Sequence, residues 1–197
     1  MAIAILDDPI EDGCIELEAG PTYTRNSTGP SISFGGWGNG EIWLKDYRGY
    51  VEWDISGLAG GTLTANPIFK YHGDSIFADE EEINPLTEEA PSGAADIDLY
   101  GYIASGPAYV DPWAHAKGTN KEVDLGATAR AHLQAAMDAG QSWFAIGLQS
   151  PAPDEGHYAS TYASIYSKEY STPTPPPTLY VEYTPLPKGG SRGYIIG

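Results

Sequence analysis

The stretch that decides the fold is Tyr47-Arg48-Gly49-Tyr50-Val51-Glu52-Trp53-Asp54-Ile55. Its residues alternate in character, with Val51, Trp53 and Ile55 on one side and Tyr50, Glu52 and Asp54 on the other. Side chains of a β-strand point alternately to the two faces of its sheet, so this pattern predicts a half-buried strand with Trp53 in the core. Ser56-Gly57 follows as a turn, which the Asp54 side chain is expected to cap.

Working outward, similar patterns predict further strands over 62–71, 97–103, 143–148 and 179–183, with Pro67 marking an edge or a bulge. One segment differs, because 127–139 is rich in helix formers and is followed by Gly140. We expect it to form the only helix, which would cap one end of a β-sandwich. The acidic region from Phe77 to Gly93 lacks periodicity and predicts an exposed loop.

Three stretches resemble the DNRLRE-type domain, a jelly-roll β-sandwich family related to carbohydrate-binding modules. Arg48 to Leu58 followed by Gly61 to Ala65 is similar to the family's strand-turn-strand. The middle stretch is Val123-Asp124-Leu125 leading to Trp143 through Leu148, and the ending is Ala163 to Tyr170 followed by Pro177 to Thr184. The resemblance implies an all-β, jelly-roll-like antiparallel β-sandwich with one short helix around 127–139.

The likeness departs from the family pattern at two positions, where Ala59 replaces a turn proline and Pro176 stands where an arginine often occurs. It runs from about Asp12 to Thr184. We therefore predict a single domain over 1–184, and we expect residues 185–197 to form a C-terminal tail that serves as an interaction arm.

The charge and the cysteine count narrow the range of partners. The formal net charge of −17 disfavours binding to nucleic acid or to an anionic membrane surface. Cys14 is the sole cysteine, so packing rather than an intrachain disulfide must hold the core together. The first residues lack the features of a signal peptide and no segment is long enough to insert into a membrane, so we expect synthesis in the cytoplasm followed by a virion or extracellular location.

Catalytic motifs are missing from the sequence. The four histidines, His72, His115, His132 and His157, lack the spacing of a zinc or iron site. No nucleophile elbow or phosphate-binding loop occurs. The sequence thus predicts a protein that is not an enzyme and has no cofactor, with calcium as a possible ligand.

Calcium is the metal that suits so acidic a chain, because it accepts carboxylate and carbonyl oxygens in flexible geometry. Two acidic segments offer candidate ligands, although neither has EF-hand spacing: Asp7, Asp8 and Asp12 in the first, and Asp79 and Glu80 in the second. A solvated acidic loop is the alternative for each.

The 14 tyrosines and 5 tryptophans exceed what one core of this size needs. Amphipathic rings suit both sugar faces and protein interfaces. The candidate binding residues are Trp37, Tyr50, Tyr100, Tyr102, Trp143 and Tyr180.

Two functions follow from these expectations. The first is a non-catalytic structural subunit of an extracellular or viral assembly, such as a virion decoration, fibre or coat component. Such a subunit would associate with its own copies or with other subunits through its sandwich faces and terminal arms. The alternative is a carbohydrate-binding module of a cell-surface or secreted protein, which would bind polysaccharide.

Overall fold

The structure is a computed structural model that describes residues 1–18, 22–38, 43–76, 81–150, 163–170 and 174–187. Two helices and a short 3₁₀ turn accompany the strands: α1 (Asp96–Ile103), α2 (Gly126–Asp138) and η1 (Ser56–Leu58). The strands are β1 (Ala2–Leu6), β2 (Glu11–Glu18), β3 (Thr22–Asn26), β4 (Ser31–Gly38), β5 (Trp43–Asp54), β6 (Thr62–Leu63), β7 (Ile68–Ile76), β8 (Glu81–Leu86), β9 (Val110–Trp113), β10 (Gly118–Asp124), β11 (Trp143–Gln149), β12 (Ala163–Tyr166) and β13 (Thr178–Thr184).

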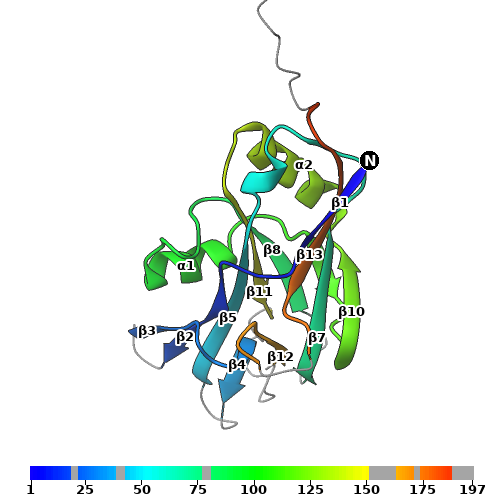
Figure 1. The fold of residues 1–197 in the computed structure, drawn as a ribbon. Helices are drawn as coiled ribbons and strands as arrows, with labels where there is room; N and C mark the ends of the chain where they lie inside the picture. Colours follow the sequence, from blue (N-terminus) through cyan, green and yellow to red (C-terminus); the bar gives the residue numbers. More distant parts are fainter. Residues whose placement is uncertain (19–21, 39–42, 77–80, 151–162, 171–173, 188–197) are drawn as a thin grey trace, which may run out of the picture.

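The strands form one curled, antiparallel sheet whose order is β1-β13-β7-β12-β4-β5-β11-β8-β9 (Figure 1). One half, sheet A, contains β1, β6, β7, β10, β12 and β13, and the other half, sheet B, contains β2, β3, β5, β8, β9 and β11. Strand β4 joins the halves, because Ser31 to Phe34 pair with β12 and Gly35 to Gly38 pair with β5. Gly35 has a φ of 89° at this transition, a conformation that favours glycine.

The main core lies between the two halves. It contains Trp53, Phe69 and Trp113 from three different strands, together with aliphatic residues of β4, β11, β12 and β13. Trp53 has no exposed surface and donates its indole N–H to the Pro177 carbonyl at 3.2 Å. The period-two pattern of the sequence therefore predicted this side of β5 correctly, and the fold is the expected all-β, jelly-roll-like sandwich.

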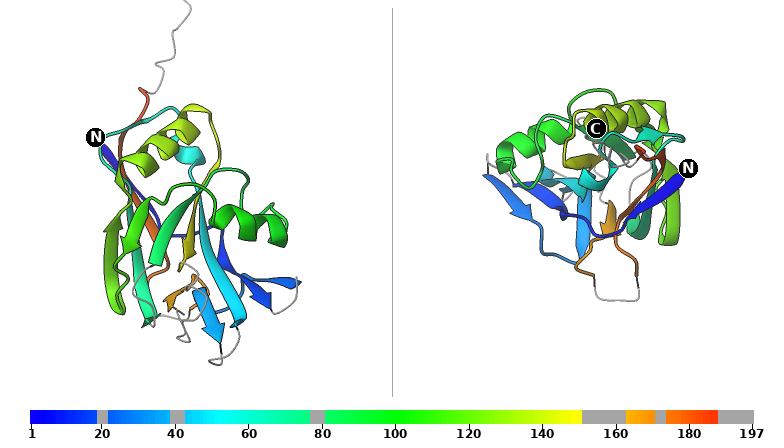
Figure 2. Two further views of the ribbon diagram at one scale, coloured as in Figure 1. Left: turned by 180° about the vertical axis from the view of Figure 1, so that it is seen from behind. Right: turned by 45° about the horizontal axis from the view of Figure 1, so that its top comes forward.

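Helix α2 closes one end of the sandwich, as the sequence predicted (Figures 1 and 2). Leu133 and Met137 are buried in the main core. The Gln134 side chain accepts a hydrogen bond from the Leu63 amide at 2.7 Å and donates one to the Gly61 carbonyl at 2.9 Å. These bonds tie the helix to the turn that follows β5.

The expected strand over 97–103 is wrong, because this segment is helix α1. Leu99, Tyr100 and Ile103 are buried at helical spacing, whereas Ile97 is 57% exposed. Helix α1 covers the second face of sheet B, and a second hydrophobic cluster fills the space between them. A Cβ on Gly147 would lie 2.8 Å from the Ile103 side chain, so this glycine lets the helix approach β11 closely. Residues 49–53 of β5 are consequently buried on both faces, so this part of the strand is not half-buried as predicted.

The predicted loop over 77–93 is also partly wrong. Residues Glu81–Leu86 form β8, which pairs with β11 on one side and β9 on the other. Pro85 lies opposite Ile146 inside the sheet. The predicted strand over 62–71 is divided into β6 and β7, and Pro67 lies between them.

Strand β13 ends at Thr184. Residues 188–197 of the expected arm lie outside the described part of the chain, so the arm stays a prediction.

Candidate functional site

The outer face of sheet A carries two groups of side chains that the core does not use. Leu179 and Val181 of β13 and Phe69 and Tyr71 of β7 point into the core. Because side chains alternate along a strand, the residues between them point outward. The outer face holds a polar and aromatic group near β12 and an aliphatic group on β1.

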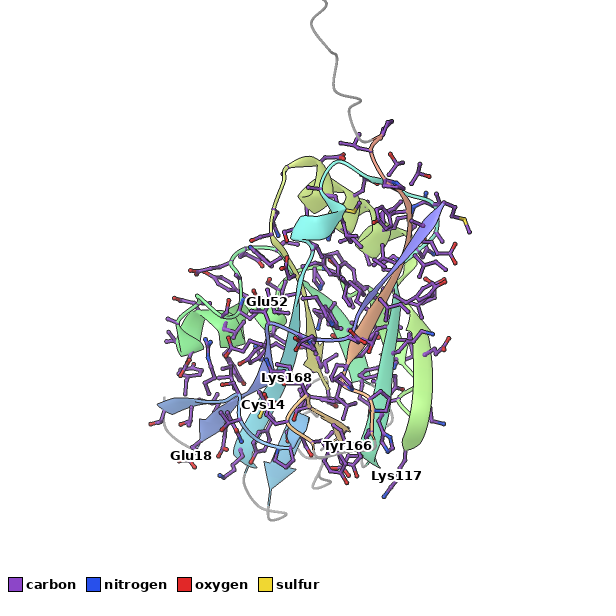
Figure 3. The ribbon with its side chains drawn as sticks, in the orientation of Figure 1. Cys14, Glu18, Glu52, Lys117, Tyr166 and Lys168 are labelled. Carbon is purple, nitrogen blue, oxygen red and sulfur yellow. The ribbon has the colours of Figure 1, made fainter. Side chains whose placement is uncertain are left out.

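The first group, called the Tyr166 patch, consists of His72, Asp74, Tyr166, Tyr170 and Ser31. The rings of Tyr166 and Tyr170 stack with centroids 3.7 Å apart and planes at 17°. The His72 ring lies 4.6 Å from the Tyr166 ring. Tyr166 lies toward the end of the sandwich opposite α2 (Figure 3). Three of these side chains are partly exposed aromatic rings on neighbouring strands or the following turn.

Asp74 supplies the charge of the Tyr166 patch. Its Oδ2 accepts hydrogen bonds from the hydroxyls of Ser31 and Ser164, each at 3.2 Å. Hydrogen bonds to Tyr170 and Asp74 raise the pKa of Tyr166 above its ordinary value. The patch can therefore offer flat rings together with hydroxyl and carboxylate groups, the combination that polar ligands with apolar faces require.

The second group, called the β1 strip, consists of Met1, Ile3 and Ile5. These side chains are 84%, 53% and 60% exposed. Ile5 lies opposite Tyr180 in the ladder, and the Lys70 ammonium lies 5.0 Å from the centre of the Tyr180 ring. Tyr180 donates its hydroxyl hydrogen to Glu182 at 3.2 Å. Tyr180, one of the aromatic residues predicted from the sequence to bind a ligand, therefore lies on the outer face of sheet A.

Four other predicted aromatic residues lie around helix α1. Tyr50 and Tyr100 are buried in the second hydrophobic cluster, and Tyr102 and Trp143 pack against it. The Tyr50 hydroxyl donates to Glu11 at 2.9 Å, while burial and the Glu11 charge raise the pKa of Tyr50 well above its ordinary value. These rings are brought together by packing between sheet B and α1, and they form no open platform.

Two arginines hold α1 on sheet B. The Arg48 guanidinium lies 3.8 Å from the centre of the Tyr100 ring and donates to the Tyr100 carbonyl at 2.6 Å. Arg25 donates to the Asp96 carboxylate at 2.9 Å and to the Pro91 carbonyl at 2.8 Å. Both guanidinium groups are therefore engaged in holding the helix.

The calcium candidates of the first acidic segment are not arranged as a metal site. Asp7 and Asp8 are exposed, whereas Asp12 is completely buried. The Lys168 ammonium donates to the carbonyls of Pro9 and Ile10 at 2.9 and 2.8 Å, so a cation already occupies these oxygens (Figure 3). Within the described ranges, no cluster of three or more acidic, histidine or cysteine side chains is suited to a metal ion.

Asp12 itself fastens the turn after β12 to β2. Its Oδ2 accepts a hydrogen bond from the Lys168 amide at 3.0 Å, and its Oδ1 is buried without a hydrogen-bond partner among the described residues. Burial, and secondarily the neighbouring Glu169 carboxylate, raise the pKa of Asp12 to about 7, against the opposing effect of the Lys168 amide. The ionised form of Asp12 is therefore disfavoured in the folded protein.

Three predicted residues cannot be placed in a site. Trp37 belongs to β4, but its side chain is outside the described part of the structure, as are Asp79 and Glu80.

His115 lies inside the core and not on the surface. It packs among Phe34, Tyr71 and Trp113, with ring centroids 5.0 to 5.6 Å away. Burial lowers the pKa of His115 to about 4, so the imidazole is neutral at physiological pH. Its two ring nitrogens have no hydrogen-bond partner in the described part of the chain, and its surroundings are aromatic rather than metal-binding.

The sequence prediction missed His72, Tyr166, Tyr170 and the β1 strip. Tyr166 and Tyr170 are four residues apart on the two sides of one turn, and such a turn can bring two rings together. The alternation of alanine and isoleucine in residues 2–5 is a signal for a strand with one aliphatic face.

Comparison with family models and with curated protein sequences identifies no relative. No protein-family model matches the chain, and no curated protein is significantly similar to it in sequence. The likeness to the DNRLRE-type domain consequently stays a prediction. Among the described residues, no helix has the length and apolar character that crossing a membrane requires.

Proposed function

We propose that this protein is a non-catalytic structural subunit of an extracellular or viral assembly, of the kind that decorates a virion or forms part of a fibre or coat. It associates with copies of itself through the outer face of its sandwich. The observation that carries this proposal is the β1 strip, where two isoleucines of one edge strand expose more than half of their surface.

The proposal depends on the position of these isoleucines as well as on their exposure. Single exposed aliphatic residues are common on protein surfaces, but Ile3 and Ile5 lie side by side on one face of the same strand. They continue into Tyr180 of the neighbouring strand. An apolar group next to an unpaired strand edge is typical of a surface that another chain covers.

Light scattering combined with size-exclusion chromatography tests the proposal on the full chain. We expect the wild-type protein to exceed its monomer mass of 21.0 kDa, and the double variant Ile3→Lys/Ile5→Lys to elute as a monomer. The matched control is Ile97→Lys, which adds a charge at an exposed isoleucine of α1 and should leave the mass unchanged. A wild-type protein that stays monomeric up to millimolar concentration would contradict the proposal.

Carbohydrate binding is the second candidate function, and the Tyr166 patch favours it. Stacked aromatic rings beside a carboxylate and hydroxyl groups can contact both the apolar face and the hydroxyls of a sugar. The test is electrophoretic retardation in gels that contain acidic or neutral polysaccharides. Retardation that is lost in Tyr166→Ala and kept in Tyr102→Ala supports this function, whereas unretarded wild-type protein argues against it for those polysaccharides.

A further inference from the structure

Strand β1 differs from the other edge strands of the sandwich. Among the described strands of four or more residues, β1, β3, β9 and β10 each pair on one side only. Strand β3 contains Arg25, β9 contains Asp111 and Pro112, and β10 contains three charged residues. Charges and proline on an edge prevent it from pairing with another chain. Strand β1, with the sequence Ala-Ile-Ala-Ile-Leu, has neither.

The sequence of β1 is also nearly symmetrical about its centre. If two copies run antiparallel with Ala4 opposite Ala4, then Ile3 of each copy lies opposite Ile5 of the other, and Ala2 lies opposite Leu6. Both isoleucine pairs would be on the outer face, where these side chains are now exposed. A partner with a different sequence would not be matched in this way, so the strand itself favours a second copy.

Charge restricts where two copies can meet and in which register. The chain carries a net charge of −17, so two copies repel one another, and the repulsion is smallest where they meet at an uncharged surface. Residues 1–6 contain no charged side chain, and Asp7 and Asp8 follow immediately. With Ala4 at the centre, Asp7 of one copy is six residues, or about 20 Å, from the position of Asp7 in the other. A pairing centred on Leu6 would make them diagonal neighbours about 7–8 Å apart.

We propose that β1 pairs antiparallel with β1 of a second copy across a two-fold axis at Ala4, so that sheet A continues from one copy into the other. This inference rests on the proposed assembly function and specifies its contact. The ladder then places Ile68, Tyr180 and Ile5 of one copy in a row with Ile3 of the other. The contact is isologous, meaning that each copy contributes the same surface, and it closes as a dimer that larger assemblies can use as a building block.

Disulfide cross-linking tests both the contact and its register. Cys14 is buried, so cysteines introduced on β1 are the accessible thiols of the described chain. A copy with Ile3→Cys and a size tag is mixed with an untagged copy carrying Ile5→Cys, under mild oxidation. Opposite residues of an antiparallel pair have the separation that a disulfide needs, whereas Ile3 and its own counterpart are diagonal and too far apart. The control pairs Ile3→Cys with Ile97→Cys, an exposed position on α1.

We expect the Ile3→Cys and Ile5→Cys copies to cross-link on the order of a hundredfold faster than the control pair at micromolar protein, because pairing holds the two thiols at millimolar effective concentration. Equal rates would overturn the β1 contact, and faster linking of Ile3→Cys to itself would overturn the axis at Ala4. Light scattering separates the two levels of the proposal. An oligomer without the specific cross-link contradicts only the β1 contact, whereas a monomer contradicts the assembly function as well.

Discussion

Replacement of Asp12 by asparagine is expected to stabilise the protein at neutral and alkaline pH. Asp12 is completely buried, and one of its carboxyl oxygens has no hydrogen-bond partner in the described structure. Its pKa is raised from 3.8 to about 7, mainly by burial. The ionised form is therefore disfavoured in the folded protein, and an asparagine side chain has the shape of the protonated form.

The sign of the pH dependence follows from proton binding. Between about pH 4 and pH 7 the folded protein keeps a proton on Asp12 that the unfolded chain has released. The free energy of unfolding consequently falls as the pH rises through this interval, and the loss is complete above pH 7. At about 1.4 kcal/mol per pKa unit, the interval from 3.8 to about 7 corresponds to on the order of 4 kcal/mol.

Urea unfolding between pH 4 and pH 8 measures this effect. We expect Asp12→Asn to gain about 2–4 kcal/mol over the wild type at pH 8 and to differ little from it near pH 4. Asp7→Asn is the control, because it removes the same charge from an exposed position of the neighbouring turn. Wild-type stability that rises from pH 4 to pH 8 as much as that of Asp12→Asn would refute the reasoning.

Two further predictions concern the helices. Leu133→Ala removes a buried side chain of α2 and should lower the free energy of unfolding by about 3 kcal/mol, while Ile97→Ala at an exposed position should change it by less than about 0.5 kcal/mol, both measured by urea unfolding. Arg25→Ala removes the guanidinium that donates to the Pro91 and Ala94 carbonyls and to the Asp96 carboxylate, and it should cost about 2–4 kcal/mol. Faster proteolysis within residues 91–103 would confirm a loosened α1, and unchanged proteolysis would contradict it.

The sequence correctly predicted those segments whose residue pattern fits only a strand or only a helix. Val51, Trp53 and Ile55 have period two together with a β-branched or aromatic character, and they are buried as expected. Helix α2 has strong helix formers and a glycine at its end, and both its position and its role at the end of the sandwich are confirmed. The Asp54 cap is likewise present, with the Ser56 amide donating to its carboxylate at 2.7 Å.

The strand predicted over 97–103 was wrong because its residues fit both the two-residue period of a strand and the spacing of a helix. Leu99 and Ile103 satisfy both the alternation of a strand and the spacing of a helix. Asp96 and Asp98 in the first turn, where negative charge favours a helix, could have decided between them. Strand β8 was missed because acidic residues and a proline are unusual in a strand paired on both sides.

The outer face of sheet A could be predicted only in part. The Tyr166 patch combines β4, β7 and β12, which are distant in sequence, so it depends on a strand order that residue patterns do not reveal. Alternation of aromatic with aliphatic residues, as at Tyr50, cannot distinguish a solvent-exposed face from one covered by a helix such as α1.

Hydrogen exchange as a function of protein concentration tests most directly whether β1 is the contact surface. In dilute protein, the amide hydrogens of β1 that point away from β13 should exchange rapidly. Our account predicts that protection of the peptide covering residues 1–6 increases on association, while the peptide covering α1 is unchanged. An assembled protein in which residues 1–6 exchange as fast as in the monomer would contradict it.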